Sequence, residues 1–169
     1  MNSKDLEFKS YTLGDVKVIE LLLLYRYKYD DYFFMKQESS LMAVNGVVPI
    51  NEEVLLTYAS LDDCIEKCKF DEVQLKMLEL LGYGYTYEEI SEVLGVLPSV
   101  IAGRMKTIYK RIVKENVWQW RKSIYKGKLE LKTKTCSKCK DVLPATPEFY
   151  SDLERTKDGF HSQCRKCKK

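Results

Sequence analysis

Residues 71–112, DEVQLKMLELLGYGYTYEEISEVLGVLPSVIAGRMKTIYKRI, decide the fold because they predict three consecutive helices with clear stop signals between them. Apolar residues recur at helical spacing from Asp71 until Gly82, a residue type common at helix ends. Thr86 and Glu89 then stand at the spacing of a capping box, in which each side chain accepts a hydrogen bond from the backbone N–H of the other residue. A second helix is therefore expected to begin directly after Thr86.

This second helix is short, and a turn separates it from the third. Its inward side chains are expected to be Ile90, Val93 and Leu94, and Gly95 ends it. Pro98 suits the first turn of the third helix, where its missing N–H would have had no partner. Apolar residues then follow at intervals of four, three and four, and they predict the buried face of the third helix: Ile101, Met105, Ile108 and Ile112.

A capped short helix, a glycine turn and a basic third helix form the layout of a helix-turn-helix. The chain has 28 Lys and Arg against 25 Asp and Glu, yet residues 97–134 contain eleven basic residues and only Glu115 and Glu130 as acids. A solvated helix face explains many such charge runs. A polyanionic partner is the more specific interpretation, because a row of cations gains free energy by releasing the counterions condensed on nucleic-acid phosphates.

The same segment resembles region 4 of bacterial sigma factors and of related phage regulators. The resemblance covers Asp71 to Ile112 and rests on four short motifs: Leu78-Glu79-Leu80, Thr86-Tyr87-Glu88-Glu89-Ile90, Leu94-Gly95 and Arg104-Met105. It implies a compact helical unit whose last helix, Pro98 to Val113, enters the major groove of duplex DNA. The residues then expected to contact DNA are Ser99, Ala102, Gly103, Arg104, Lys106, Lys110, Arg111 and Lys114.

Several of these positions depart from the family pattern. Ser99, Ala102 and Gly103 are short where region 4 proteins carry longer polar groups, so little direct reading of base edges is expected. Gly103 costs about 1 kcal/mol relative to Ala inside a helix, which suggests that it lets a backbone or DNA approach closely. Nothing upstream resembles a promoter-melting region, so we expect a regulator that uses this module rather than a complete sigma factor. An ordinary helical bundle with a glycine turn is the alternative.

Two Cys-x-x-Cys hooks, Cys136 to Cys139 and Cys164 to Cys167, carry the strongest signal in the sequence. Four thiolates give the closed tetrahedral shell of a structural Zn²⁺ site, with Zn–S bonds of about 2.3 Å. The segment 133–169 is too short to fold by burial alone and needs a staple. No secretory signal is readable at the N-terminus, so the thiols are expected to stay reduced, and a disulfide or redox pair is the weaker alternative.

The tail resembles the small zinc finger that often precedes the catalytic segment of phage and bacterial HNH endonucleases. The matching motifs are Lys134 to Cys139, Leu143-Pro144, Glu148-Phe149-Tyr150, Lys157-Asp158-Gly159 and Gln163 to Cys167. The resemblance implies that the four cysteines hold zinc and that Phe149, Tyr150 and Phe160 form a small core. The catalytic segment of that family does not follow before Lys169, and the single histidine, His161, is interpreted as exposed and not as a ligand. We therefore expect no enzymatic activity.

The first 70 residues are acidic, with 12 Asp and Glu against 8 Lys and Arg, and are expected to be helical. Apolar periodicity predicts one long helix from Thr12 to Gln37 and a second from Asn51 towards Lys67. Cys64 and Cys68 are interpreted as reduced core cysteines. Trp118 and Trp120 are both expected to pack against the protein, with stacking on exposed bases as the alternative.

The sequence thus predicts a mainly α chain with four parts. They are an acidic helical region (1–69), a helix-turn-helix domain (70–126), a basic linker (127–134) and a zinc-ribbon-like four-Cys module (135–169). The expected function is DNA-binding transcription regulation by a phage or prophage protein in the cytoplasm of its bacterial host. Duplex DNA is the expected partner, RNA polymerase or a second copy of the chain are further candidates, and no membrane association is expected. An adaptor for RNA polymerase or another host protein is the alternative, and a shortened nuclease is the enzymatic one.

Overall fold

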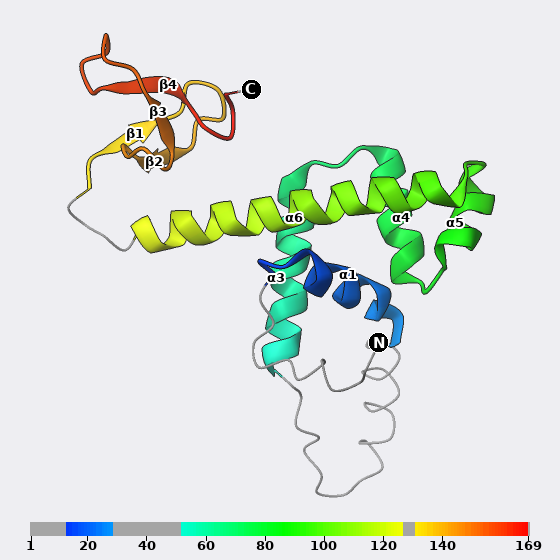
Figure 1. Ribbon diagram of the computed structural model, residues 1–169. Helices are drawn as coiled ribbons and strands as arrows, with labels where there is room; N and C mark the ends of the chain where they lie inside the picture. The colour runs from blue at the N-terminus through cyan, green and yellow to red at the C-terminus, as the bar shows by residue number, and fades with distance from the viewer. Residues whose placement is uncertain (1–12, 29–51, 127–130, 169) are drawn as a thin grey trace, which may run out of the picture. The chain divides into compact units, whose positions relative to one another are not determined.

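The computed structural model describes residues 13–28, 52–126 and 131–168 (Figure 1). The described chain is mostly helical and has small antiparallel sheets near its C-terminal end, which confirms the predicted fold class at that level. It divides into two compact units, residues 1–117 and 118–169. We call them the helical unit and the cysteine unit.

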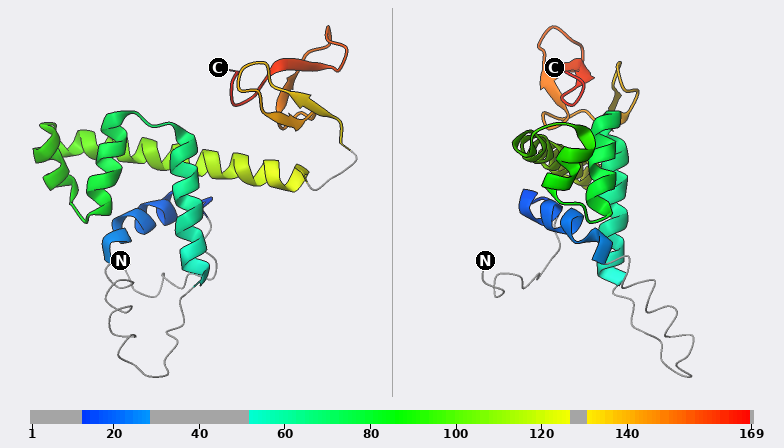
Figure 2. Two further views of the ribbon diagram at one scale, coloured as in Figure 1. Left: turned by 180° about the vertical axis from the view of Figure 1, so that it is seen from behind. Right: turned by 90° about the vertical axis from the view of Figure 1, so that its right-hand side faces the viewer.

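The helical unit contains α1 (Val16–Leu24), α3 (Glu52–Cys68), α4 (Glu72–Gly82), α5 (Tyr87–Leu94) and residues 98–117 of α6 (Pro98–Lys126). Figures 1 and 2 show α4 and α5 beside the N-terminal half of α6. The helix ends follow the local signals. The Thr86 N–H donates to Glu89 Oε2 at 2.7 Å, and the Glu89 N–H donates to Thr86 Oγ1 at 3.3 Å, so the predicted capping box is confirmed. Gly95 ends α5 in the left-handed conformation, with φ of 64°.

The core of the helical unit is formed by α1, α4, α5 and α6 together, with contributions from α3. The predicted buried face of α6 is confirmed, because Ile101, Met105, Ile108 and Ile112 are fully buried. Val93 on α5 was expected to point inward but is 55% exposed, because the buried side of α5 runs through Ile90 and Ser91 to the partly buried Leu94. The acidic N-terminal helices and the third helix of the sequence motif thus share one core, although the sequence placed them in separate domains.

The helix predicted from Thr12 to Gln37 begins at Val16 and is interrupted at Tyr25, which caps α1, and residues 26–28 are helical again. The residues after this break contact α3 and the turn that follows α4. The guanidinium of Arg26 donates two hydrogen bonds to Asp62 on α3, at 2.6 and 2.8 Å. The Tyr27 ring lies against Gly84, where a Cβ would meet Tyr27 Cγ at 2.9 Å. Residues 29–37 lie outside the described part of the chain.

Arg111 lies on α6, and its side chain contacts residues at the junction between α3 and α4. Its guanidinium donates to the Cys68 carbonyl at 2.6 Å and to Gln74 Oε1 at 2.9 Å, and it lies 4.4 Å from the centre of the Phe70 ring. Charge-assisted hydrogen bonds and a cation–π contact of this kind tie α6 to the junction between α3 and α4. The structure therefore places Arg111 in an internal contact and not on the phosphate-binding surface that the sequence suggested.

The cysteine unit is built from two antiparallel hairpins. Strand β1 (Thr133–Thr135) pairs with β2 (Val142–Pro144), and β3 (Tyr150–Asp152) pairs with β4 (Phe160–Cys164). Phe149 and Tyr150 are fully buried, as predicted, and Phe160 is partly buried against them. The Tyr150 hydroxyl donates to the Lys134 carbonyl at 2.7 Å and so links the two hairpins.

The last turns of α6 belong to this second unit. Trp118 and Tyr125 both meet Phe149 edge-on, with ring centres 5.1 and 5.5 Å apart, and Lys122 pairs with Asp141 at 3.4 Å. These contacts explain why the division between the units falls between Val117 and Trp118, whereas the sequence suggested a boundary after residue 126.

The contacts of Arg111 predict that its substitution destabilises the protein more than substitution of the neighbouring Lys110 does. Arg111→Met removes the charge-assisted hydrogen bonds to Gln74, Cys68 and Lys69 and leaves the Cys68 carbonyl without that donor, so we expect the free energy of unfolding to fall by about 2 kcal/mol. Lys110→Met, at an exposed position one residue away, is expected to change it little. Urea unfolding followed by circular dichroism measures both, and equal effects of the two substitutions would contradict the internal role of Arg111.

Candidate metal centre and nucleic-acid surface

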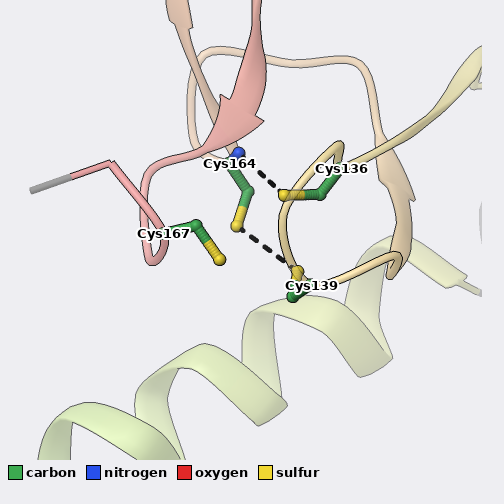
Figure 3. Close-up of side chains that lie close together, drawn as sticks. All are labelled: Cys136, Cys139, Cys164 and Cys167. Carbon is green, nitrogen blue, oxygen red and sulfur yellow. Dashed lines mark hydrogen bonds between the residues drawn. The ribbon is translucent and has the colours of Figure 1, made fainter.

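The four C-terminal cysteines converge on one point (Figure 3). Their sulfur atoms all lie within 4.8 Å of one another, and Cys139 Sγ is 3.9 Å from Cys164 Sγ. Sulfurs at the corners of a tetrahedron with Zn–S bonds of 2.3 Å would be about 3.8 Å apart. The two hooks, separated by 24 residues in the sequence, are thus brought together at a spacing close to that of a zinc site.

Backbone turns hold each hook in shape. In the first, the Lys140 N–H donates to the Cys136 carbonyl at 3.0 Å, and Lys140 adopts a positive φ of 63°. In the second, the N–H groups of Cys167 and Lys168 both donate to the Cys164 carbonyl at 2.9 Å. The first hook lies between β1 and β2, and the second begins at the last residue of β4. Each hairpin therefore positions one pair of sulfurs.

The environment of the sulfurs favours anionic charge at Cys136, whereas burial raises the pKa of Cys139. Burial raises the pKa of Cys136, but N–H donors from Cys164, Cys139 and Lys138 outweigh this and lower it to about 6. The Cys164 N–H lies 3.3 Å from Cys136 Sγ. Burial raises the pKa of Cys164, which is fully enclosed. A bound divalent cation would hold all four as thiolates, because metal coordination displaces the thiol protons.

The donor set and its surroundings fit structural zinc. Cys136 and Cys164 are buried, Cys167 is half-buried and Cys139 is exposed, and all six cysteines of the chain are free thiols. Among the described residues, these four form the one group of three or more potential metal-ligating side chains. His161 stands apart from them, half-buried, with Nδ1 accepting from the Gln163 N–H at 3.1 Å.

The residues expected to contact DNA fall into three environments. Gly103, Arg104, Lys106, Lys110 and Lys114 are exposed, as is Ser99 near the start of α6. Ala102 is half-buried. Arg111 makes the internal contacts described above. Lys106, Lys110 and Lys114 follow at intervals of four, so they lie on one face of α6, away from the buried row that contains Met105 and Ile108.

Two features escaped the sequence argument. The structure separates the tryptophans that were expected to pack alike: Trp118 is 9% exposed, whereas Trp120 is 65% exposed. A helical count shows that residues two apart cannot share one face, and this signal was available in the sequence. The role of Arg111 had no such signal, because its partners Cys68 and Gln74 are about forty positions away.

The fold and site together define a mainly helical protein with a small four-cysteine module suited to structural zinc. Comparison with known proteins adds one partial likeness. A segment of 34 residues is 47% identical to the SPbeta prophage-derived putative HNH endonuclease YoqL of Bacillus subtilis (strain 168). That segment is 20% of this chain and 15% of the relative, so the chain spans only a small part of that protein.

No family model matches the chain, and no solved structure matches it. The likeness to sigma factor region 4 that the sequence motifs suggested thus finds no support in these comparisons. Within the residues that the structure describes, no helix has the length and apolar character needed to cross a membrane.

The cysteine geometry predicts metal content. The purified full chain is expected to bind about one zinc per chain, and Cys164→Ser is expected to lose it, because three sulfurs leave the tetrahedral shell open. Removing zinc with a chelator should also change the emission of Trp118, whose contact with Phe149 depends on the fold of this unit. Elemental analysis and fluorescence measure these effects.

Cys68→Ser on α3 is the matched control, because it removes a cysteine outside the cluster. Equal zinc content in Cys164→Ser and Cys68→Ser would contradict the assignment.

Proposed function

We propose that this chain is a DNA-binding transcription regulator of phage or prophage origin. In this proposal α5 and α6 form a helix-turn-helix that docks in the major groove, and the four-cysteine module holds one structural zinc ion. The observation that carries the proposal is the exposed row of Lys106, Lys110 and Lys114 on the face of α6 opposite its buried residues.

The local geometry supports this reading of α5 and α6. The capping box fixes the start of α5, and Gly95 allows a turn of three residues before Pro98 opens α6. No acidic residue occurs between Pro98 and Lys114. Within the described ranges, no ion pair joins the lysines of the row to an acid. Such a surface attracts phosphates at low ionic strength and contributes affinity that does not depend on sequence.

The four-cysteine module supports the phage origin. We infer that the 34-residue likeness to the prophage protein falls on this module, because residues 135–169 are close to that length and carry the motifs of the zinc finger found in HNH endonucleases. Lys138, Lys140, Arg165 and Lys166 are exposed around the hooks. The module would therefore brace the C-terminal part of the protein and present further cations to DNA.

A nuclease is the second candidate function, because the relative is described as a putative HNH endonuclease. Among the described residues, however, the cysteine cluster is the one potential metal site of three or more ligands, and a four-thiolate shell leaves no open position for a catalytic water. Incubating the zinc-loaded chain with supercoiled plasmid and Mg²⁺ or Mn²⁺ separates the two functions. Metal-dependent nicking would favour the nuclease, and shifted but intact plasmid would favour the regulator.

The lysine row predicts a salt-dependent effect on DNA binding. The double substitution Lys106→Gln and Lys110→Gln is expected to weaken binding to duplexes of unrelated sequence to a similar extent. It should also reduce the slope of log affinity against log salt by about 2, since each lost phosphate contact contributes about 0.9. Fluorescence anisotropy over a range of salt concentrations measures both quantities.

Lys76→Gln serves as the control for this double variant, because Lys76 is exposed on α4 and pairs with Glu79. An unchanged salt slope in the double variant would remove the lysine row from the DNA surface.

Gly103 predicts opposite effects on stability and binding. It lies inside α6 and is exposed, and apart from its chain neighbours and the local helix backbone no described atom lies within 4 Å of where a Cβ would stand. Gly103→Ala is therefore expected to raise the free energy of unfolding, by up to about 1 kcal/mol. If DNA approaches the helix backbone at this position, the added methyl group should weaken duplex binding. Urea unfolding and anisotropy measure the two effects.

Gly82→Ala is the matched control, because Gly82 is also helical and its Cβ would make only an ordinary contact of 3.8 Å with Arg26. A Gly103→Ala variant that is more stable and binds DNA unchanged would show that nothing approaches the helix closely there.

A further inference from the structure

The two tryptophans of the chain stand two residues apart on α6 and have different surroundings. Trp118 is buried against Phe149, and Tyr125 meets the same ring from the next turns of the helix. Trp120 projects from another side of the helix and is 65% exposed. Ile124, one turn further on, is 40% exposed on that same side. The cysteine unit thus has an exposed apolar ridge that its own core does not use.

The charge of this unit indicates the kind of partner that such a ridge would bind. Residues 118–169 contain fourteen Lys and Arg against six Asp and Glu, and one zinc ion with four thiolates lowers this excess by two charges. Arg121, next to Trp120, is exposed. A partner with an anionic backbone and accessible aromatic faces complements both features. Unpaired nucleotides have this chemistry, whereas a duplex keeps the faces of its bases stacked inside.

We propose that Trp120, with Ile124 and Arg121, is a stacking site for unpaired bases of a single-stranded nucleic acid. The indole ring would lie against the face of one base, Ile124 would extend the apolar contact, and Arg121 would neutralise a phosphate. Stacking of this type tolerates any base, because every base has a π face. The site lies on α6 beyond the C-terminal end of the lysine row that carries the proposed duplex binding.

The test uses the full zinc-loaded chain and two oligonucleotides, oligo(dT) and oligo(rU), so that the sugar is varied while the base chemistry is similar. We expect bound oligonucleotide to quench tryptophan emission in the unsubstituted chain and much less in Trp120→Phe, where buried Trp118 is the one remaining tryptophan. Trp120→Ala should weaken binding by about tenfold or more, measured by anisotropy of a labelled oligonucleotide.

Tyr83→Ala is the matched control, because Tyr83 is an aromatic residue of the helical unit that is 68% exposed. Weaker binding of Trp120→Ala to either oligonucleotide, with Tyr83→Ala unaffected, supports the site and identifies its ligand as DNA, RNA or both. Zinc content and circular dichroism of Trp120→Ala should equal those of the unsubstituted chain, since the side chain is outside the core.

Three results would overturn the proposal. The first is equal affinity of Trp120→Ala and the unsubstituted chain for both oligonucleotides. The second is undiminished quenching in Trp120→Phe. The third is self-association of the unsubstituted chain that Trp120→Ala abolishes. Sedimentation would detect it, and it would mean that Trp120 binds a second protein chain.

The double variant Lys106→Gln and Lys110→Gln should keep the quenching by oligo(dT) even where duplex binding fails, so the two proposals can fail independently.

Discussion

The other features of this protein depend on how α6 divides its side chains between two cores. Its N-terminal half buries Ile101, Met105 and Ile108 in the helical unit, and its last turns bury Trp118 in the cysteine unit. Because α6 buries side chains in two cores, only the rest of its surface is available to bind partners. That surface carries Lys106, Lys110 and Lys114 in one part and Trp120 with Ile124 in the other. The lysine row and the Trp120 site therefore both consist of positions on α6 that neither core uses.

The cysteine unit shows why a metal is the natural source of its stability. Its core has few large side chains, mainly Leu143, Phe149, Tyr150 and Trp118, and its sheets have only two strands each. A core of this size contributes little free energy, and small domains of this kind commonly depend on a metal or a disulfide. The four sulfurs lie at the ends of the two hairpins, so one ion held by all four would fix the hairpins to each other.

Local chemistry explains which features could be predicted from the sequence. The capping box at Thr86, the stop at Gly95, the buried row of α6 and the cysteine hooks all depend on residues close together in the chain or on a simple period. The failures involve distant partners. Gly84 has a positive φ of 88°, and the Tyr27 ring occupies the space that its Cβ would need. Likewise the Arg26–Asp62 pair and the internal contacts of Arg111 depend on the packing of helices, which periodicity does not specify.

Arg111 also changes how the charge of α6 should be interpreted. A count of cations treats Lys110 and Arg111 as equivalent, but one is exposed and the other is held by a carbonyl and an amide. Under the proposed function, the remaining cations contribute affinity through phosphates, while the short side chains Ser99 and Gly103 offer few groups for base edges. Specificity would then have to come from the shape and deformability of the DNA, because a closely approached helix backbone senses groove geometry more than base identity.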